Sequence, residues 1–362
     1  MNILIDIGHP GHVHLFRNLY FELRQRKHSV LVSTKDDPAI TDLMRLFDIP
    51  FILLGKKKDS ILGKVSDQIN FNKQIWQIAK KENIKIGIGT SVSLAHVSRF
   101  SKMKSILLDD DDDEVQPLFV KYVHPFCDYL ISPDVLKGKR KRKDTIYYPG
   151  LHELAYLHPY RFKPDIRVLK EIGLQQDDVF FVLRFNVFKA HHDKGAQGLS
   201  LDQKLQLIAL LKPHGKIFIT TERDIEPELK KFQLNLSPEK IHSLLKYAKL
   251  FIGDSQTMTS EAVVLGTPAI RCNSFANSIS YLNEEEKKYG LTYAFLPERF
   301  NELIQKTREL LSTPNLKAKW AIKSQNLLND KIDSTKFYLW LIENINSIGK
   351  VNFDKGFFKG FY

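Results

Sequence analysis

Short apolar runs alternate along most of the chain with longer segments in which apolar residues recur at helical spacing. The first run covers residues 2–7 and is followed by a glycine-containing turn at residues 9–12. The segment 13–26 then carries leucine at every fourth position, and a second apolar run covers residues 28–34. Short apolar runs bounded by turns are typical of buried strands, whereas the leucine spacing is typical of an amphipathic helix. The pattern therefore predicts an amino-terminal β–turn–α–β unit with parallel strands.

The same alternation continues through the rest of the chain in two series. In the first, strands are predicted at residues 50–54, 84–89, 104–108 and 128–131, and helices at 39–47, 65–82 and 94–101. In the second, strands are predicted at 179–184, 216–220, 250–252 and from 268, and helices at 166–172, 201–211, 239–248, 257–265, 300–311, 315–327 and 334–345. Such alternation predicts an α/β fold with two doubly wound sheets, whose functional edges lie at the carboxyl ends of the strands.

The length of 362 residues also indicates two domains, because it exceeds what one core usually organises. We place the first domain at residues 1–155 and the second at residues 156–345, with the boundary close to a proline-flanked segment. Residues 346–362 form a tail whose last ten residues include four phenylalanines and one tyrosine. We expect this tail to dock on the body of the protein or to be poorly ordered, with a weak interfacial membrane contact as the alternative.

Charge narrows the range of partners. The formal net charge is +12, and six of the seven residues from Lys137 to Lys143 are basic. A run of this kind is most often a solvated loop, and its alternative role is attraction to an anionic membrane surface. No basic surface interleaved with aromatic residues and no recognition motif accompanies it, so a nucleic-acid partner is not expected.

Targeting and redox signals predict a cytoplasmic location. Peripheral contact with the inner face of the membrane is compatible with the same signals. The amino terminus lacks a basic segment and a cleavage site, and the chain has no apolar run of about 18 residues. Cys127 and Cys272 are far apart and lack the spacing of metal ligands, so both are expected to be reduced core thiols.

The strongest candidate site is the stretch from residue 250 to residue 271, which is predicted to form a strand, a tight turn, a helix and a second strand. The turn at Gly253, Asp254 and Ser255 would leave unpaired N–H groups of the helix start at the edge where open α/β sheets bind phosphate. Glu261 lies about one helical turn further on and could accept hydrogen bonds from both hydroxyls of a ribose. In the alternative interpretation, Asp254 or Ser255 simply caps an ordinary helix.

Three strand ends of the first domain carry further candidates. These are the histidine-rich turn after the first strand, Thr90 and Ser91 after the fourth, and the acidic run 109–114 after the fifth. Clustered carboxylates suit Mg²⁺ or Mn²⁺, but five adjacent aspartates cannot all converge on one ion, and a solvated loop explains most of the run. We therefore expect no metal site.

Four separated motifs resemble, in the right order, a bacterial and archaeal family of unknown function with the GT-B fold. They cover residues 6–16, 150–156, 162–164 and 253–268, and the resemblance extends to about residue 345. It implies two Rossmann-like domains that face each other across a cleft. Through this family the chain is similar to UDP-N-acetylglucosamine 2-epimerases and to the N-acetylglucosaminyltransferase that makes lipid II. Both groups bind a nucleoside diphosphate sugar.

The match to these groups is incomplete. Pro10-Gly11-His12 corresponds to the Gly-Gly-His turn of the transferase, and Asp254 to Glu261 align with the Asp-Ser-Gly-Gly-x-x-Glu-Glu signature of the epimerases. Gln256 and Thr257 replace the two glycines of that signature, so hydroxyl groups would replace bare backbone in contacting phosphate. The full set of epimerase carboxylates and histidine in the first domain has no counterpart here.

Residue types and resemblance together assign roles. His12 is the leading candidate for the base, with Asp109 as a second catalytic group that the resemblance places at its strand end, whereas capping of a helix is the alternative role of His12. The predicted nucleotide-sugar ligands are Arg184, Glu222, Ser255, Gln256, Thr257, Met258 and Glu261. The predicted acceptor-binding residues are His9, Gly11, Thr90 and Ser91.

We therefore predict a GT-B-type glycosyltransferase that moves a sugar from a nucleoside diphosphate donor, such as a UDP-sugar, to a saccharide or lipid-linked acceptor in surface polysaccharide or glycolipid assembly. No cofactor is expected beyond this nucleotide-sugar co-substrate. The alternatives are a UDP-sugar 2-epimerase and a non-catalytic protein that binds sugar nucleotides.

Overall fold

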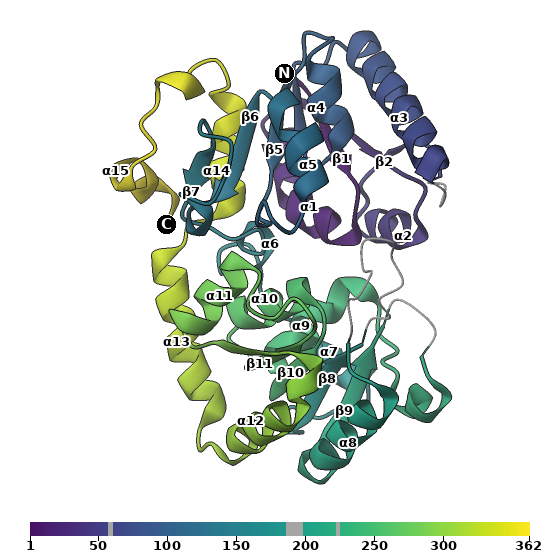
Figure 1. Cartoon of the computed structure of the whole chain (residues 1–362), viewed down its shortest axis with the longest axis vertical. Coiled ribbons are helices and arrows are strands. Elements are labelled where there is room, and N and C mark those ends of the chain that lie inside the picture. The colour runs from purple at the N-terminus through teal and green to yellow at the C-terminus, as the bar shows by residue number, and fades with distance from the viewer. Residues whose placement is uncertain (57–60, 186–197, 222–224) are drawn as a thin grey trace. The chain divides into compact units, whose positions relative to one another are not determined.

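The computed structural model describes residues 1–56, 61–185, 198–221 and 225–362. These residues form two compact units, one of Met1–Tyr156 together with Lys331–Tyr362, and one of Leu157–Asp330 (Figure 1). Each unit is built on one parallel β-sheet with flanking helices, so the predicted α/β architecture with two doubly wound sheets is confirmed.

The first unit contains a seven-stranded sheet in the order β3-β2-β1-β4-β5-β6-β7. Its neighbouring strands all run parallel. The strands are β1 Asn2–Ile7, β2 Ser29–Thr34, β3 Ile52–Leu53, β4 Ile86–Gly89, β5 Lys104–Leu108, β6 Tyr129–Pro133 and β7 Ile146–Tyr148. Because successive strands are added to one side of β1 as far as β3 and to the other side from β4, the order reverses between β1 and β4. This reversal is the switch point at which open α/β sheets bind ligands.

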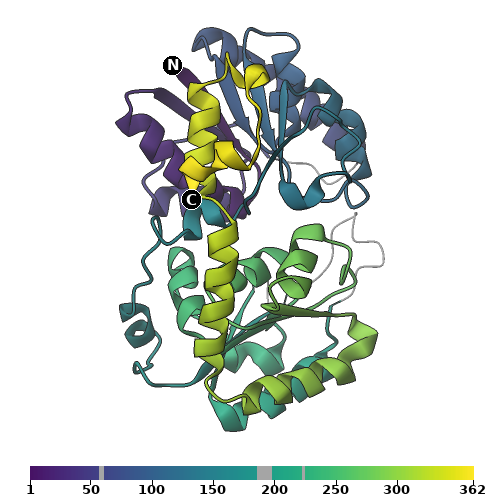
Figure 2. The same ribbon diagram turned by 90° about the vertical axis from the view of Figure 1, so that its left-hand side faces the viewer.

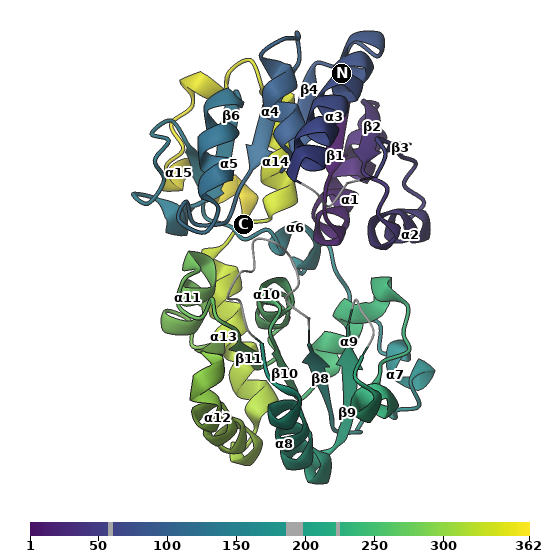
Figure 3. The same cartoon turned by 45° about the vertical axis from the view of Figure 1, so that its right-hand side comes forward.

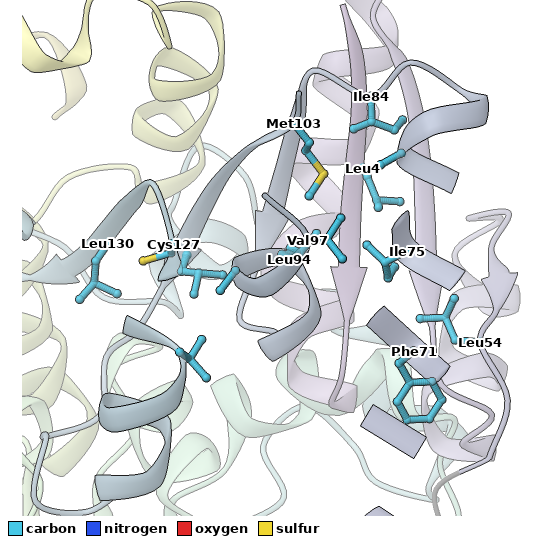
Figure 4. Close-up of a cluster of buried hydrophobic side chains, with 14 residues drawn as sticks. Leu4, Leu54, Phe71, Ile75, Ile84, Leu94, Val97, Met103, Cys127 and Leu130 are labelled. Atoms are coloured by element: carbon cyan, nitrogen blue, oxygen red, sulfur yellow. The ribbon is translucent and has the colours of Figure 1, made fainter. Parts of the chain in front are cut away.

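Helices cover both faces of this sheet (Figure 3). The helices of this unit are α1 Pro10–Gln25, α2 Pro38–Leu46, α3 Ile61–Lys81, α4 Val92–Ser98, α5 Pro117–Tyr122, α6 Leu154–Leu157, α14 Ser334–Glu343 and α15 Lys355–Phe358. Figure 4 shows the core beneath α3 and α4, where Phe71 and Ile75 of α3 and Leu94 of α4 pack with Leu4 of β1. Burial of such side chains stabilises the sheet by roughly 1.5–3 kcal/mol each.

The carboxyl-terminal segment packs on the first unit, whereas the sequence-based boundaries assigned residues 334–345 to the second domain. Helix α14 lies beside α1, and Figure 2 shows it in yellow against the amino-terminal sheet. Phe337 of α14 contacts the rings of Phe353, Phe358 and Phe361 in the tail. The tail is thus docked on the body, because its aromatic rings bury one another against α14.

The second unit contains a five-stranded sheet in the order β12-β11-β10-β8-β9, again with parallel neighbours. Its strands are β8 Phe180–Arg184, β9 Lys216–Thr220, β10 Leu250–Gly253, β11 Ala269–Cys272 and β12 Thr292–Phe295. Its helices are α7 Arg167–Glu171, α8 Leu201–Leu211, α9 Ile241–Tyr247, α10 Gln256–Val264, α11 Ser280–Lys287, α12 Phe300–Ser312 and α13 Leu316–Asp330. The strand order reverses between β8 and β10, which gives this unit a switch point of its own.

The structure also bears on two expectations, one about the basic run at residues 137–143 and one about membrane-spanning helices. The basic run is not a simple solvated loop, because Arg140 is 8% exposed and bonds to Asp113 through its Nη1 atom at 2.8 Å. Lys137, Lys141 and Lys143 of the same run are exposed. Among the described residues, no helix combines the length and the apolar character needed to cross a bilayer.

Candidate functional site

The switch point of the first unit brings together four of the predicted residues. Helix α1 follows β1 directly, and Nδ1 of its capping residue His9 accepts a hydrogen bond of 3.1 Å from the backbone N–H of Gly11. One residue further on, Nδ1 of His12 lies 3.0 Å from the Thr90 hydroxyl, which follows β4. His12 is half-buried, so its imidazole is held in place and still reaches the surface.

Ser91, also predicted for the acceptor, has a structural role. Its hydroxyl caps α4 by accepting a hydrogen bond of 3.3 Å from the backbone N–H of Leu94. It also bonds to the carboxyl group of Asp6, which is 3% exposed and accepts a hydrogen bond of 2.6 Å from the Ser33 hydroxyl. Burial raises the pKa of Asp6 in spite of these hydrogen bonds. This network fixes the loops that follow β1 and β4.

Asp109 lies at the centre of a buried network. Its Oδ2 atom is 2.7 Å from Nε2 of His124 and 3.1 Å from Nη1 of Arg140, and its Oδ1 atom accepts a hydrogen bond of 2.5 Å from Gln116. Asp109 is 5% exposed and His124 is 2% exposed. Three side chains therefore already engage the carboxylate that was predicted to be catalytic, and this arrangement favours a role in holding the loop after β5.

A second carboxylate–histidine pair, which the sequence did not predict, lies beside it. Oδ2 of Asp110 is 3.0 Å from Nδ1 of His152, a residue of the motif at 150–156. Burial opposes ionisation of Asp110, but His152 and, more weakly, His12 hold the pKa of its carboxyl below its usual range. Burial likewise opposes protonation of His152, but Asp110 raises the pKa of its imidazole. The charges of Asp110, His152 and His12 thus act on one another at one edge of the sheet.

The ligand atoms of Asp109, Asp110 and Asp111 lie within 4.8 Å of one another, so these carboxylates are close enough to share a metal ion. Burial, together with the negative charges of Asp110 and Asp109, raises the pKa of Asp111 to about 7. At neutral pH this group therefore holds a proton in part of the molecules, and Asp109 and Asp110 already have cationic or hydrogen-bonding partners. The donor set suits proton transfer better than metal binding, and the expected absence of a metal stays a prediction.

The turn after β10 in the second unit is a tight connection from a strand to a capped helix. Ser255 caps α10 by accepting a hydrogen bond of 3.3 Å from the backbone N–H of Met258. Gly253 lies opposite Arg184 at the end of β8, and a Cβ atom on this glycine would be 2.6 Å from the Arg184 carbonyl oxygen. Only glycine therefore allows the two strand ends to approach this closely.

The end of β8 and the first turn of α10 carry four of the predicted donor ligands. Arg184 donates a hydrogen bond of 3.1 Å from its Nη1 atom to the Thr220 hydroxyl at the end of β9. Gln256 and Thr257 are half-buried in the first turn of α10, whereas Met258 is 8% exposed and packs inward. The positive end of the helix dipole and the hydroxyls of Ser255 and Thr257 are therefore available to an anion at the same edge.

Glu261 forms a buried pair with a histidine that sequence reasoning missed. Its Oε1 atom is 2.9 Å from Nε2 of His242 on α9, and the side chains are 5% and 1% exposed. Phe162, from the motif at 162–164, packs edge to face on the His242 ring. The pair therefore fixes the rotamer of Glu261 and joins α9 to α10. No local sequence signal marks His242, because it lies on the inner face of an ordinary helix.

One predicted ligand, Glu222, lies outside the described residues.

Beside the switch point of the first unit, a hollow of about 160 Å³ opens at the carboxyl ends of β1 and β2. Its lining residues include Gly8, Lys35, Asp36 and Lys56. This hollow offers both signs of charge within a short distance of the histidine turn.

Comparison with known proteins places this geometry in context. The uncharacterized protein MJ0665 of Methanocaldococcus jannaschii is 21% identical over 288 residues, which are 75% of this chain and 82% of that protein.

Solved structures share the whole architecture at low identity. A UDP-N-acetylglucosamine 2-epimerase superposes with a TM-score of 0.68 at 14% identity and covers 97% of this chain and 96% of its own. The epimerase from Neisseria meningitidis, bound to UDP-N-acetylglucosamine, gives 0.67 at 12% identity, with 95% and 100% coverage. The spinosyn rhamnosyltransferase SpnG, complexed with its aglycone, gives 0.63 at 10% identity, with 96% and 100% coverage.

These likenesses show the GT-B fold, as the sequence motifs predicted. The profile of one protein family matches residues 1–289, which is most of the chain. The chain therefore belongs to the family described as "Protein of unknown function (DUF354)".

Proposed function

We propose that this protein is a glycosyltransferase that moves a sugar from a UDP-sugar to a saccharide or lipid-linked acceptor. The observation that carries the proposal is the strand–turn–helix at residues 250–264, in which a capped helix start and two hydroxyls lie at a switch point of a GT-B fold, next to the strand end that carries Arg184. A helix amino terminus stabilises the negative charge that develops on a departing diphosphate.

In this proposal the second unit binds the donor. Arg184 contacts the diphosphate through its guanidinium group, and Ser255 and Thr257 donate from their hydroxyls. Glu261 accepts hydrogen bonds from the ribose, and His242 holds its carboxylate in the required rotamer at 2.9 Å. The Neisseria meningitidis epimerase binds UDP-N-acetylglucosamine, and SpnG binds thymidine diphosphate, so two proteins of this fold use nucleotides of this class.

The first unit supplies the base. His12 accepts the proton of the acceptor hydroxyl, the acceptor oxygen forms a bond to the anomeric carbon, and the bond from that carbon to the diphosphate breaks. UDP leaves with the electron pair of that bond. The Asp110 carboxylate interacts favourably with a positively charged His12, so it lowers the cost of protonating the imidazole as the reaction proceeds.

We expect this chemistry to need no metal ion, because the helix dipole, the hydroxyls and the arginine stabilise negative charge on the leaving group. We expect turnover to persist after treatment with a chelator.

The proposal also places the protein in the cytoplasm, where nucleotide sugars are available, in surface polysaccharide or glycolipid assembly.

Thermal-shift measurements with UDP test the donor site. A ligand that binds only the folded state raises the melting temperature in proportion to the logarithm of its concentration over Kd. We expect UDP to stabilise the wild type, and Glu261→Gln to reduce that shift strongly. Glu298→Gln, which changes an exposed glutamate of the same unit, is the matched control. A purely structural Glu261 would lower the melting temperature of the variant but leave the UDP-induced shift intact, and that result would remove Glu261 from the site.

The second candidate function is a UDP-sugar 2-epimerase. The Asp110–His152 pair favours it, because it supplies acid–base groups at the edge of the first sheet. An epimerase converts UDP-N-acetylglucosamine without an acceptor, whereas a transferase releases UDP when an acceptor is added. Chromatography of the sugar nucleotide after incubation with protein alone distinguishes the two.

A further inference from the structure

An apolar groove lies on the outer surface of the first unit, on the helices that cover one face of its sheet. It has a volume of about 430 Å³. Its lining includes Trp76 of α3, His96 of α4, Phe100 just beyond α4, and Phe126 of the 3₁₀-helix His124–Phe126 that follows α5. Helices α3, α4 and α5 lie side by side here (Figure 3). None of these residues belongs to the switch point at the carboxyl ends of β1 and β4.

The groove is built from fixed side chains. The Trp76 indole N–H donates a hydrogen bond of 3.2 Å to the Phe100 carbonyl oxygen. Nδ1 of His96 is 3.1 Å from the amide nitrogen of Asn72, and its Nε2 is 2.8 Å from the Tyr122 carbonyl oxygen. These bonds join α3, α4 and the end of α5, so the apolar surface is formed before any partner arrives.

Large apolar side chains project beyond this groove. Phe100 is 80% exposed, Ile69 is 64% exposed and Val65 is 58% exposed. Trp76 and Phe126 remain 38% and 39% exposed at its walls. A cluster of this kind on one face marks an interaction site rather than scattered surface residues.

Cations dominate the charge of this face. Segments 63–81, 92–104 and 117–126 contain a single acidic residue, Asp67, which is 8% exposed. The exposed cations on these segments include Lys73, Lys80, Lys81, Arg99, Lys102 and Lys121. Lys80 lies over the Trp76 ring at 5.1 Å, and Lys121 lies over the Tyr122 ring at 5.1 Å. The partner must therefore be apolar and anionic at once.

We propose that this face docks the protein on an anionic lipid surface, with Ile69, Phe100 and Trp76 inserted at the interface and the lysines against the headgroups. Aromatic rings and lysines with apolar stems are the side chains that occupy the boundary between headgroups and acyl chains. An anionic leaflet attracts each nearby lysine with about 1 kcal/mol. The inference does not depend on the proposed reaction, and it assigns the contact to a different surface from Lys137–Lys143.

Co-sedimentation with vesicles tests the proposal directly. The full chain should bind vesicles of equal parts phosphatidylcholine and phosphatidylglycerol, bind pure phosphatidylcholine much more weakly, and lose affinity as salt is raised. The double variant Ile69→Ser with Phe100→Ser should lower the partition coefficient at least tenfold, because both side chains leave the apolar region. The double variant Lys73→Gln with Lys80→Gln should lower it by roughly an order of magnitude, on phosphatidylglycerol only.

Two control pairs carry matched changes elsewhere. Leu46→Ser with Ile322→Ser removes exposed apolar side chains, which are 47% and 66% exposed, and Lys137→Gln with Lys143→Gln removes exposed charge. Both should bind vesicles as the wild type does, and urea midpoints should confirm that all four variants fold. Failure of the wild type to bind anionic vesicles would overturn the proposal, as would unchanged binding by both face variants. A concentration-dependent dimer that Phe100→Ser abolishes would also overturn it, in favour of a second copy of this chain.

Discussion

The two switch points share a topology and differ in their chemistry. At the first, between β1 and β4, ionisable side chains crowd the edge, with His12, Asp110 and His152 interacting through their charges. At the second, between β8 and β10, the edge offers a capped helix start, hydroxyls and one arginine. Parallel strands in the same arrangement therefore produce two different kinds of site.

The comparison separates what the fold supplies from what the side chains supply. In both units the fold delivers loops to the carboxyl edge of the sheet. Coupled acids and histidines suit the first edge to moving a proton, whereas the helix dipole, the hydroxyls and Arg184 suit the second to holding an anion. The division of labour in the proposed transfer reaction follows from this difference.

Replacing the histidine of the first switch point should have the largest effect. His12→Ala should lower the rate of UDP release from UDP-N-acetylglucosamine by about 10²–10⁴-fold, under acceptor conditions that support wild-type turnover, because it removes the base. The thermal shift with UDP should stay unchanged, since the donor site belongs to the other unit. His214→Ala, at an exposed position of the second unit, is the control. If His12→Ala also abolished the thermal shift with UDP, donor binding would not be confined to the second unit.

Replacing Asp109 in its buried network should lower the stability of the protein. Asp109→Asn gives His124 a neutral partner and leaves Arg140 with Asp113 as its remaining carboxylate. It should lower the free energy of unfolding by about 3 kcal/mol, as expected when one member of a buried ion pair is removed. Urea titration measures the change, and Glu114→Gln, at an exposed position of the same loop, should shift the curve little. A change no larger than that of the control would mean that Asp109 has a catalytic role rather than a structural one.

A smaller effect should appear in the pH dependence of stability. The ordinary pKa of an aspartate is 3.8, and burial with two neighbouring carboxylates raises the pKa of Asp111 to about 7. Between these values the unfolded chain releases a proton that the folded chain keeps, so the free energy of unfolding falls as pH rises. Asp111→Asn should therefore gain roughly 2 kcal/mol over the wild type at pH 8, discounted for a half-buried group, and almost nothing below pH 4. Parallel stability curves for the two proteins would contradict the raised pKa.

Sequence pattern predicted the parts of the molecule that local signals determine. The strand–turn–helix at residues 250–264 and the strands at 104–108 and 216–220 follow from short apolar runs and caps. The four-residue strand β12 and helix α11, with its three adjacent glutamates, were missed because neither has a clear apolar period.

The site was less predictable because its contacts join distant positions. Asp109 meets Arg140, and Glu261 meets His242, through pairings that depend on which helices and loops become neighbours. Composition was misleading in the same way, since the acidic run and the basic run each resemble solvent-exposed loops. In the folded protein Arg140 inserts between Asp109 and Asp113 and makes both runs part of one structure.

The return of the chain's end to the first unit has a consequence for synthesis. Residues 157–330 form the second unit from one uninterrupted stretch, so that unit can fold while the ribosome is still adding residues. The amino-terminal sheet, although made before the second unit, receives α14 and its aromatic tail only after that unit has been made. Of the two units, the one that emerges first is therefore completed last, and until then the surface of α1 that α14 covers stays open to chaperones and to aggregation.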